Sequence, residues 1–123
     1  MAKKILIADD EQNIVISLEF LMKREGYEVS VANDGDEAAR RIRAEKPDLV
    51  LLDVMMPKKS GFEVCQEVKS NPELQSVRIL MLTAKGRDTE VAKGLALGAD
   101  AYMTKPFSTK ELVERVRSML AER

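Results

Sequence analysis

Residues 48–53 read Asp-Leu-Val-Leu-Leu-Asp, a run of four apolar residues bounded by two carboxylates. A half-buried strand alternates apolar and polar residues, whereas a strand covered on both faces is continuously apolar. The run is far shorter than the roughly 20 residues that a membrane-spanning helix needs. We therefore predict a buried strand near the centre of a parallel sheet that has helices on both faces.

Similar short runs recur on either side of this one. Four further strands are predicted, at Lys4–Ala8, Tyr27–Val31, Arg78–Thr83 and Ala101–Thr104. The segments with helical spacing are Gln12–Glu25, the Asn33-Asp34-Gly35 turn to about Glu45, Phe62–Ser70, Asp88 to Gly98, and a capping box at Ser108-Thr109-Lys110-Glu111 leading through Leu120. Alternating strands and helices predict an α/β fold. Since the chain has no linker or shift of composition, we expect residues 1–123 to form one domain.

The fourth predicted helix differs from the others in having a glycine, Gly94, in its middle. Asp88 is expected to be its N-cap, and Gly98 to end it. A mid-helix glycine costs up to about 1 kcal/mol relative to alanine, so we expect a helix that is easily shifted. Its expected inward residues are Val91, Ala92, Leu95 and Ala96.

The chain has no histidine, and Cys65 is its single cysteine. Without imidazole there is no Ser-His-Asp or Cys-His catalysis, no His-ligated zinc and no phosphohistidine. One cysteine excludes an internal disulfide and fits a reducing compartment, and we expect Cys65 to be a small core residue. The net charge of −1 argues against direct binding of nucleic acid or anionic membranes. With neither a signal peptide nor a membrane span in view, a cytoplasmic protein is expected.

Polar side chains gather where the predicted strands end. Asp9 and Asp10 follow the first strand, Asp53 ends the third, Thr83 ends the fourth, and Lys105 follows the fifth. Each alone has an ordinary structural explanation, such as a helix cap or a solvated turn lysine. Ligands of parallel α/β sheets nevertheless bind at this edge. Three carboxylates crowded together repel one another, which favours a cation between them.

The residue types indicate a site for Mg²⁺ and a phosphoryl group, with Mn²⁺ as the alternative ion. Asp53 would be a carboxylate nucleophile that forms an acyl phosphate. Asp10 would hold the metal, with Asp9 assisting through water. Lys105 would neutralise charge on the phosphoryl oxygens, and Thr83 would donate a hydrogen bond to one of them.

From Ile5 to about Leu120 the chain resembles the receiver domains of bacterial two-component response regulators. The resemblance is carried by Asp9-Asp10, by Leu51-Leu52-Asp53-Val54-Met55-Met56-Pro57 with Gly61, by Leu82-Thr83-Ala84, and by Gly98-Ala99-Asp100-Ala101-Tyr102 leading to Lys105-Pro106-Phe107. It implies a flavodoxin-like (βα)5 fold with strand order 2-1-3-4-5. It also implies a metal bound by Asp10, Asp53 and the backbone carbonyl of Met55, and a cis peptide bond between Lys105 and Pro106.

The same resemblance implies that a histidine kinase or histidine phosphotransfer protein phosphorylates Asp53. Phosphorylation would draw Thr83 inward, and Tyr102 would follow and alter the surface of helix 4, strand 5 and helix 5, which controls a downstream partner that the sequence does not identify. We expect a monomer, with activation-dependent dimerisation through that surface as an option. The charged residues that resemble part of such a dimer interface are Lys93, Asp100, Glu111 and Arg115, with Ala101 where a second aspartate is common. A simple solvated charged face is the alternative interpretation.

Two other functions remain open at this point. Phosphatases of the haloacid-dehalogenase type also use an aspartate nucleophile with Mg²⁺, but they place a second aspartate two residues later, where this chain has Met55. A thioether cannot activate water, so the phosphoryl group is expected to persist and the protein to be a switch and not an enzyme. A phosphorylation-independent adaptor is disfavoured because Asp9, Asp10, Asp53 and Lys105 are all present. The chain is either a stand-alone receiver or part of a longer regulator.

Overall fold

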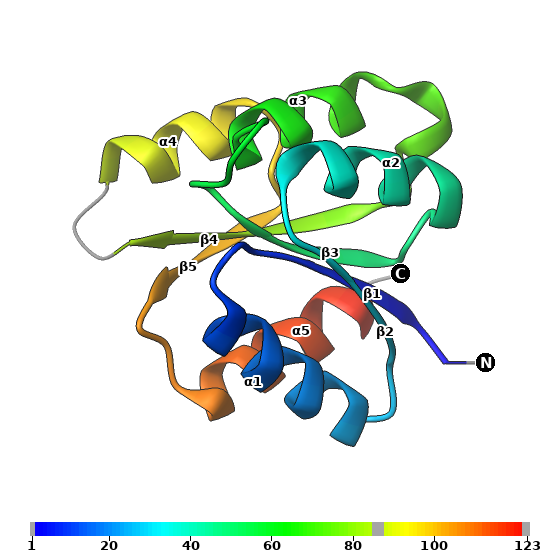
Figure 1. Ribbon diagram of the computed structural model, residues 1–123, viewed down its shortest axis with the longest axis vertical. Coiled ribbons are helices and arrows are strands. Elements are labelled where there is room, and N and C mark those ends of the chain that lie inside the picture. Colours follow the sequence, from blue (N-terminus) through cyan, green and yellow to red (C-terminus); the bar gives the residue numbers. More distant parts are fainter. Residues whose placement is uncertain (1, 85–87, 122–123) are drawn as a thin grey trace.

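The computed structural model describes residues 2–84 and 88–121, which form a five-stranded parallel sheet between two layers of helices (Figure 1). The strands are β1 (Lys4–Ala8), β2 (Glu28–Ala32), β3 (Leu49–Asp53), β4 (Arg78–Ala84) and β5 (Ala101–Lys105), in the order β2-β1-β3-β4-β5. The helices are α1 (Gln12–Arg24), α2 (Gly35–Glu45), α3 (Gly61–Ser70), α4 (Asp88–Ala96) and α5 (Thr109–Ala121), with a short 3-10 turn at Pro72–Leu74. The predicted flavodoxin-like topology and strand order are confirmed.

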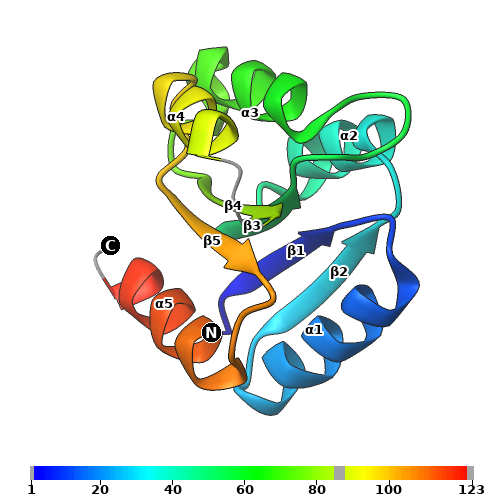
Figure 2. The same cartoon turned by 90° about the vertical axis from the view of Figure 1, so that its left-hand side faces the viewer.

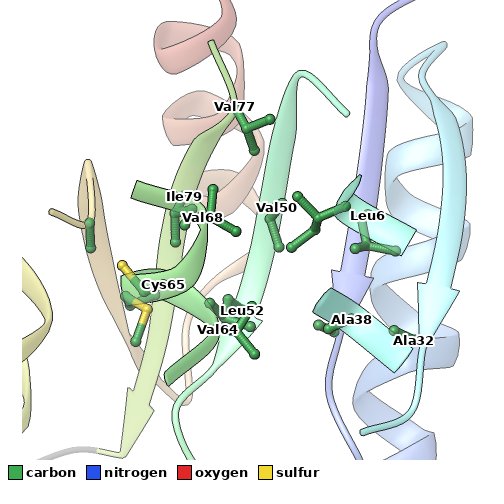
Figure 3. Packing of buried hydrophobic residues seen from close by; sticks show 14 of the residues in the cluster. Leu6, Ala32, Ala38, Val50, Leu52, Val64, Cys65, Val68, Val77 and Ile79 are labelled. Carbon is green, nitrogen blue, oxygen red and sulfur yellow. The ribbon is translucent and has the colours of Figure 1, made fainter. Parts of the chain in front are cut away.

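The sheet separates two hydrophobic cores. Helices α1 and α5 cover one face, and α2, α3 and α4 cover the other (Figure 2). Successive residues of β3 face opposite cores: Val50 and Leu52 join the α2/α3 side, and Leu49 and Leu51 join the α1/α5 side. Figure 3 shows the α2/α3 side, where Cys65 packs among aliphatic side chains. All five residues of β3 are buried. The continuous apolar run therefore reflects a strand that is covered on both faces, as predicted.

Capping side chains in the sequence determine where three of the helices begin. The Asp34 side chain caps α2 by accepting a hydrogen bond from the Glu37 amide, at 2.8 Å. At α3, Ser60 and Glu63 form a reciprocal capping box. At α5, the Ser108 hydroxyl accepts from the Glu111 amide at 3.0 Å, which is one of the two hydrogen bonds of the expected capping box.

The predicted inward face of α4 is wrong at three of its four residues, since only Val91 is half-buried. Ala92, Leu95 and Ala96 are exposed, and Gly94 is the buried residue of the helix. A Cβ added to Gly94 would lie 3.5 Å from the Met81 side chain, so the helix lies close to β4 at this position. Because α4 lies this close to β4, the side of the helix that carries Gly94 faces the sheet. The spacing of apolar residues in the sequence does not show this contact. Asp88, expected to be the N-cap, is already helical.

Smaller differences concern the limits of the strands. Strand β2 begins at Glu28 and not at Tyr27, and it continues to Ala32. Strands β4 and β5 each extend one residue further than predicted, to Ala84 and Lys105.

Within the described ranges, every helix is too short or too polar to span a membrane.

Candidate phosphoryl and metal site

The predicted site residues meet at the carboxyl edge of the sheet. Asp9 and Asp10 follow β1, and Asp53 is the last residue of β3. Thr83 is the next-to-last residue of β4, and Lys105 is the last residue of β5. The parallel register pairs Asp53 with Leu82, next to Thr83, and pairs Ala84 with Lys105. Four neighbouring strands therefore bring these side chains to one place.

Three carboxylates form a compact cluster at this edge. Asp9, Asp10 and Asp53 each offer an oxygen, and these oxygens lie within 4.8 Å of one another. Asp9 is fully buried and Asp53 is 6% exposed, whereas Asp10 faces solvent. Buried carboxylates this close repel one another unless a cation or a proton intervenes.

Among the described residues, Lys105 forms ion pairs with two carboxylates of this cluster. Its ammonium nitrogen donates to Asp9 Oδ2 at 2.9 Å and lies 3.4 Å from Asp53 Oδ1. It also donates to Glu11 Oε1 at 3.3 Å, a contact that the sequence analysis missed. Glu11 directly follows the acidic pair, which is the one signal that could have suggested it. The lysine is thus held between three carboxylates.

The electrostatic consequence is largest at Asp53. Burial, followed by the negative charge of Asp9, raises the pKa of the Asp53 carboxyl from 3.8 to about 7, although Lys105 acts in the opposite direction. Burial would lower the pKa of Lys105, but its hydrogen bond to Asp9 and the charge of Asp53 outweigh that effect and raise it. The ionised carboxylate of Asp53 is therefore held at a free-energy cost.

Thr83 is also unusual at this site. Its side chain is 1% exposed, and none of the described residues forms a hydrogen bond with its Oγ1. A buried hydroxyl without a partner costs roughly 1–3 kcal/mol. Such a group is expected where a ligand oxygen supplies the missing partner in another state of the protein.

Comparison with known proteins agrees with this geometry. The sequence model of the response regulator receiver domain matches residues 5–117. The chain belongs to the response regulator receiver domain family. The receiver domain is similar to a protein described as a response regulator from Chloroflexus aurantiacus J-10-fl, at 37% identity and a TM-score of 0.94, over 98% of this chain and 99% of that one.

Two further structures show the range of proteins that this receiver domain resembles. One is the chemotaxis response regulator CheY4 of Vibrio cholerae, at 30% identity and a TM-score of 0.90, over 97% of this chain and 99% of that one. The other is the signal receiver domain of a signal transduction histidine kinase from Syntrophus aciditrophicus, at 30% identity and a TM-score of 0.91, over 98% and 92%. These similarities agree with the observed fold and with membership in the response regulator receiver domain family.

The donor atoms of the receiver domain fit Mg²⁺, which receiver domains bind in an acidic pocket. Mg²⁺ prefers oxygen ligands and commonly binds one or two carboxylates together with water and phosphate. The three clustered carboxylates supply such oxygens, and the exposed Asp10 leaves the cluster open to solvent. An open pocket of about 300 Å³ lies between Asp10, Asp53, Met55 and Lys105, with room for a phosphoryl group.

The loop after β3 supplies Met55, whose side chain is 69% exposed. The Met55 amide donates to Asp53 Oδ1 at 3.4 Å, so it assists in orienting the carboxylate. The peptide bond between Lys105 and Pro106 is cis, the isomer expected from the sequence.

Of the two expected switch residues, Thr83 lies at the carboxyl edge of the sheet and Tyr102 lies near the start of β5. Tyr102 is 41% exposed on β5. Asp100 accepts from Lys69 and from the Ile79 amide, both at 2.8 Å, and Lys93 lies 4.6 Å from the centre of the Phe62 ring. Glu111 Oε1 accepts from the Ser108 hydroxyl at 3.2 Å. Three of the four charged residues that resemble a dimer interface therefore have partners within the chain.

Proposed function

We propose that this receiver domain accepts a phosphoryl group on Asp53 in a Mg²⁺-dependent reaction. The donor would be a phosphohistidine of a partner histidine kinase or phosphotransfer protein, because this chain has no histidine of its own. The observation that carries the proposal is the ion pair of Asp53 with the Lys105 ammonium, at 3.4 Å, beside the buried Thr83 hydroxyl of the neighbouring strand, which has no hydrogen-bond partner among the described residues. The domain then acts as a phosphorylation-dependent switch.

In the transfer, an oxygen of the ionised Asp53 carboxylate forms a bond to phosphorus. The phosphorus–nitrogen bond of the donor breaks, and the imidazole leaves with the electron pair and takes up a proton. The product is an acyl phosphate on Asp53. A bound Mg²⁺ would neutralise charge on the phosphoryl oxygens. Asp10, Asp53 and the Met55 carbonyl would hold the ion, with Asp9 assisting through water.

Two side chains would stabilise the phosphorylated state. Lys105 lies 3.4 Å from Asp53 Oδ1 and can pair with a phosphoryl oxygen on the same side. Thr83 Oγ1 would gain the acceptor that it lacks. Since a phosphoryl group adds about 1.5–2 negative charges, both interactions strengthen on phosphorylation.

The switch would operate through Thr83 and Tyr102. We infer that Thr83 moves toward the phosphoryl group and that Tyr102, now 41% exposed, moves into the space left behind. This movement would change the surface of α4, β5 and α5, where a downstream protein binds. Replacing Thr83 with alanine should leave phosphorylation intact and remove the change in partner affinity, whereas an unchanged response would contradict the coupling.

A phosphatase is the less favoured function because position 55, where phosphatases of the haloacid-dehalogenase type place their second aspartate, holds a methionine. Met55 presents a thioether there, and a thioether cannot take a proton from water. The phosphoryl group should therefore persist long enough to be a signal.

Phosphotransfer from purified, labelled histidine kinases tests the proposal. With Mg²⁺ present, we expect label to move from at least one kinase to the wild-type chain and not to the Asp53→Asn variant. A chelator should abolish the transfer. Steady multiple-turnover hydrolysis of phosphomonoesters would instead favour the phosphatase, and partner binding that is unchanged in Asp53→Asn would favour an adaptor.

Sedimentation tests the proposed oligomeric state. We expect a monomer without activation. Addition of a beryllofluoride phosphate mimic with Mg²⁺ reveals whether the surface of α4, β5 and α5 then forms a dimer. The internal partners of Asp100 and Lys93 favour a monomer in both states.

A further inference from the structure

The loop between β3 and α3, residues 54–60, has its first anchor on the sheet. The Val54 amide donates to the Leu82 carbonyl at 3.2 Å, and the Gly61 amide donates to the Val54 carbonyl at 2.8 Å. Met55, whose carbonyl is proposed above as a metal ligand, is the residue that follows Val54.

A second anchor lies at the start of α2. The Gly35 amide donates to the Pro57 carbonyl at 3.2 Å, and Lys58 Nζ lies 3.6 Å from Asp34 Oδ2. Asp34 is itself fixed, because its other carboxylate oxygen caps α2. Met55 therefore lies between an anchor on β4 and an anchor on α2, and only Met56 separates it from Pro57.

The second anchor requires a glycine at position 35. A Cβ added there would overlap the Lys59 carbonyl oxygen and lie 2.6 Å from the Lys59 carbonyl carbon. These are backbone atoms, so no side-chain rotation can relieve the contact and the loop itself must move. Gly26 provides a contrast, since its φ of +94° disfavours other residues but no described atom lies within 4 Å of its added Cβ.

We propose that the start of α2, Asp34 and Gly35, is the positioning element for the loop that carries the Met55 carbonyl. It sets the Mg²⁺ affinity of the acidic cluster without touching the ion. The mechanism is geometric: Gly35 fixes how closely α2 approaches Pro57 and Lys59, and the short connection transmits that position to Met55. This inference rests on the metal site proposed above and adds residues to which the sequence assigned no role in it.

Titration calorimetry with Mg²⁺ alone tests the proposal on three proteins: wild type, Gly35→Ala and Gly26→Ala. Removing an interaction that orients a metal ligand typically weakens metal binding about 10–100-fold, and we expect about tenfold for Gly35→Ala. Gly26→Ala should bind Mg²⁺ within about twofold of wild type, although both variants lose stability. Urea unfolding of each variant measures that loss, so an effect on affinity can be separated from a general loss of stability.

Lys58→Ala is a second variant, which decides the question if Gly35→Ala does not fold. Lys58 is exposed, so its removal should leave the fold intact. Loss of the positive charge of Lys58 would by itself strengthen the binding of a cation. Loss of the anchor predicts the opposite, a weakening of about twofold, so the direction of the change separates the two effects.

The outcomes distinguish this inference from the function on which it rests. If wild type does not bind Mg²⁺, the metal site fails and the role of α2 fails with it. If wild type binds Mg²⁺ but Gly35→Ala and Lys58→Ala bind it as tightly, the role of α2 is contradicted and the Asp53 site stands. Weakening in both variants, with Gly26→Ala unchanged, supports the proposal.

Discussion

Replacing Asp53 with asparagine should stabilise the metal-free protein, and the gain should depend on pH. In the folded chain, burial and then the charge of Asp9 raise the pKa of Asp53 from 3.8 to about 7. A carboxyl with a raised pKa binds its proton more tightly in the folded state than in the unfolded one. The wild type therefore loses stability as the pH rises from about 4 to about 7, and an asparagine is free of that loss.

The pKa difference sets the size of the effect. The interval from 3.8 to about 7 corresponds to a ceiling of about 4 kcal/mol, at 1.36 kcal/mol for each pKa unit. Water that enters this open pocket reduces the cost of the buried charge, so we expect about 2 kcal/mol at about pH 8.5. Near pH 4 the two proteins should have nearly equal free energies of unfolding.

Urea unfolding followed by far-ultraviolet circular dichroism measures the difference, with chelator present, at about pH 4 and about pH 8.5. Circular dichroism suits a chain without tryptophan. Asp36→Asn is the matched control, because Asp36 is exposed and its replacement should change stability by less than about 0.5 kcal/mol. An Asp53→Asn variant no more stable than wild type at the higher pH would refute the reasoning.

Mg²⁺ at ten times its Kd should stabilise wild type by about 1.4 kcal/mol.

Three further predictions concern single residues. Thr83→Val should raise the free energy of unfolding by about 1 kcal/mol, because it replaces a buried hydroxyl without a partner by a methyl group of similar size; a loss of stability in urea would contradict this. Asp100→Ala should lower the free energy of unfolding by about 2 kcal/mol, because the Lys69 ammonium and the Ile79 amide both lose an acceptor. A decrease below about 0.5 kcal/mol would show that these two hydrogen bonds contribute little to stability. Burial raises the pKa of the Cys65 thiol to about 11, so a thiol reagent at about pH 8 should label the unfolded chain and spare the native one; rapid native labelling would count against the buried position.

The fold could be predicted because its decisive signals are local. The apolar run at Leu49–Leu52 required two covered faces, and both cores are present. Gly26, which follows the end of α1, has a positive φ, the conformation that favours glycine after a helix. Strand order followed from the family resemblance, since local pattern alone does not determine which strands are neighbours.

Features that depend on long-range contacts were beyond the sequence. The inward face of α4 is set by the approach of Gly94 to Met81, and apolar spacing favoured Ala92 instead. The sequence offers Asp100 either as an interface residue or as part of a solvated charged face, whereas in the structure Lys69, 31 positions earlier in the chain, binds it. The contact between Glu11 and Lys105 joins residues 94 positions apart, which no local pattern encodes.

The central claim is that Asp53 accepts a phosphoryl group when Mg²⁺ is present. Intact-mass spectrometry after incubation with acetyl phosphate, a small phosphodonor, tests it without a partner protein. We expect one phosphoryl group on wild type with Mg²⁺, none with chelator, and none on Asp53→Asn, with peptide analysis placing the group at Asp53. Equal phosphorylation of wild type and Asp53→Asn, or full phosphorylation in the presence of chelator, would contradict the account.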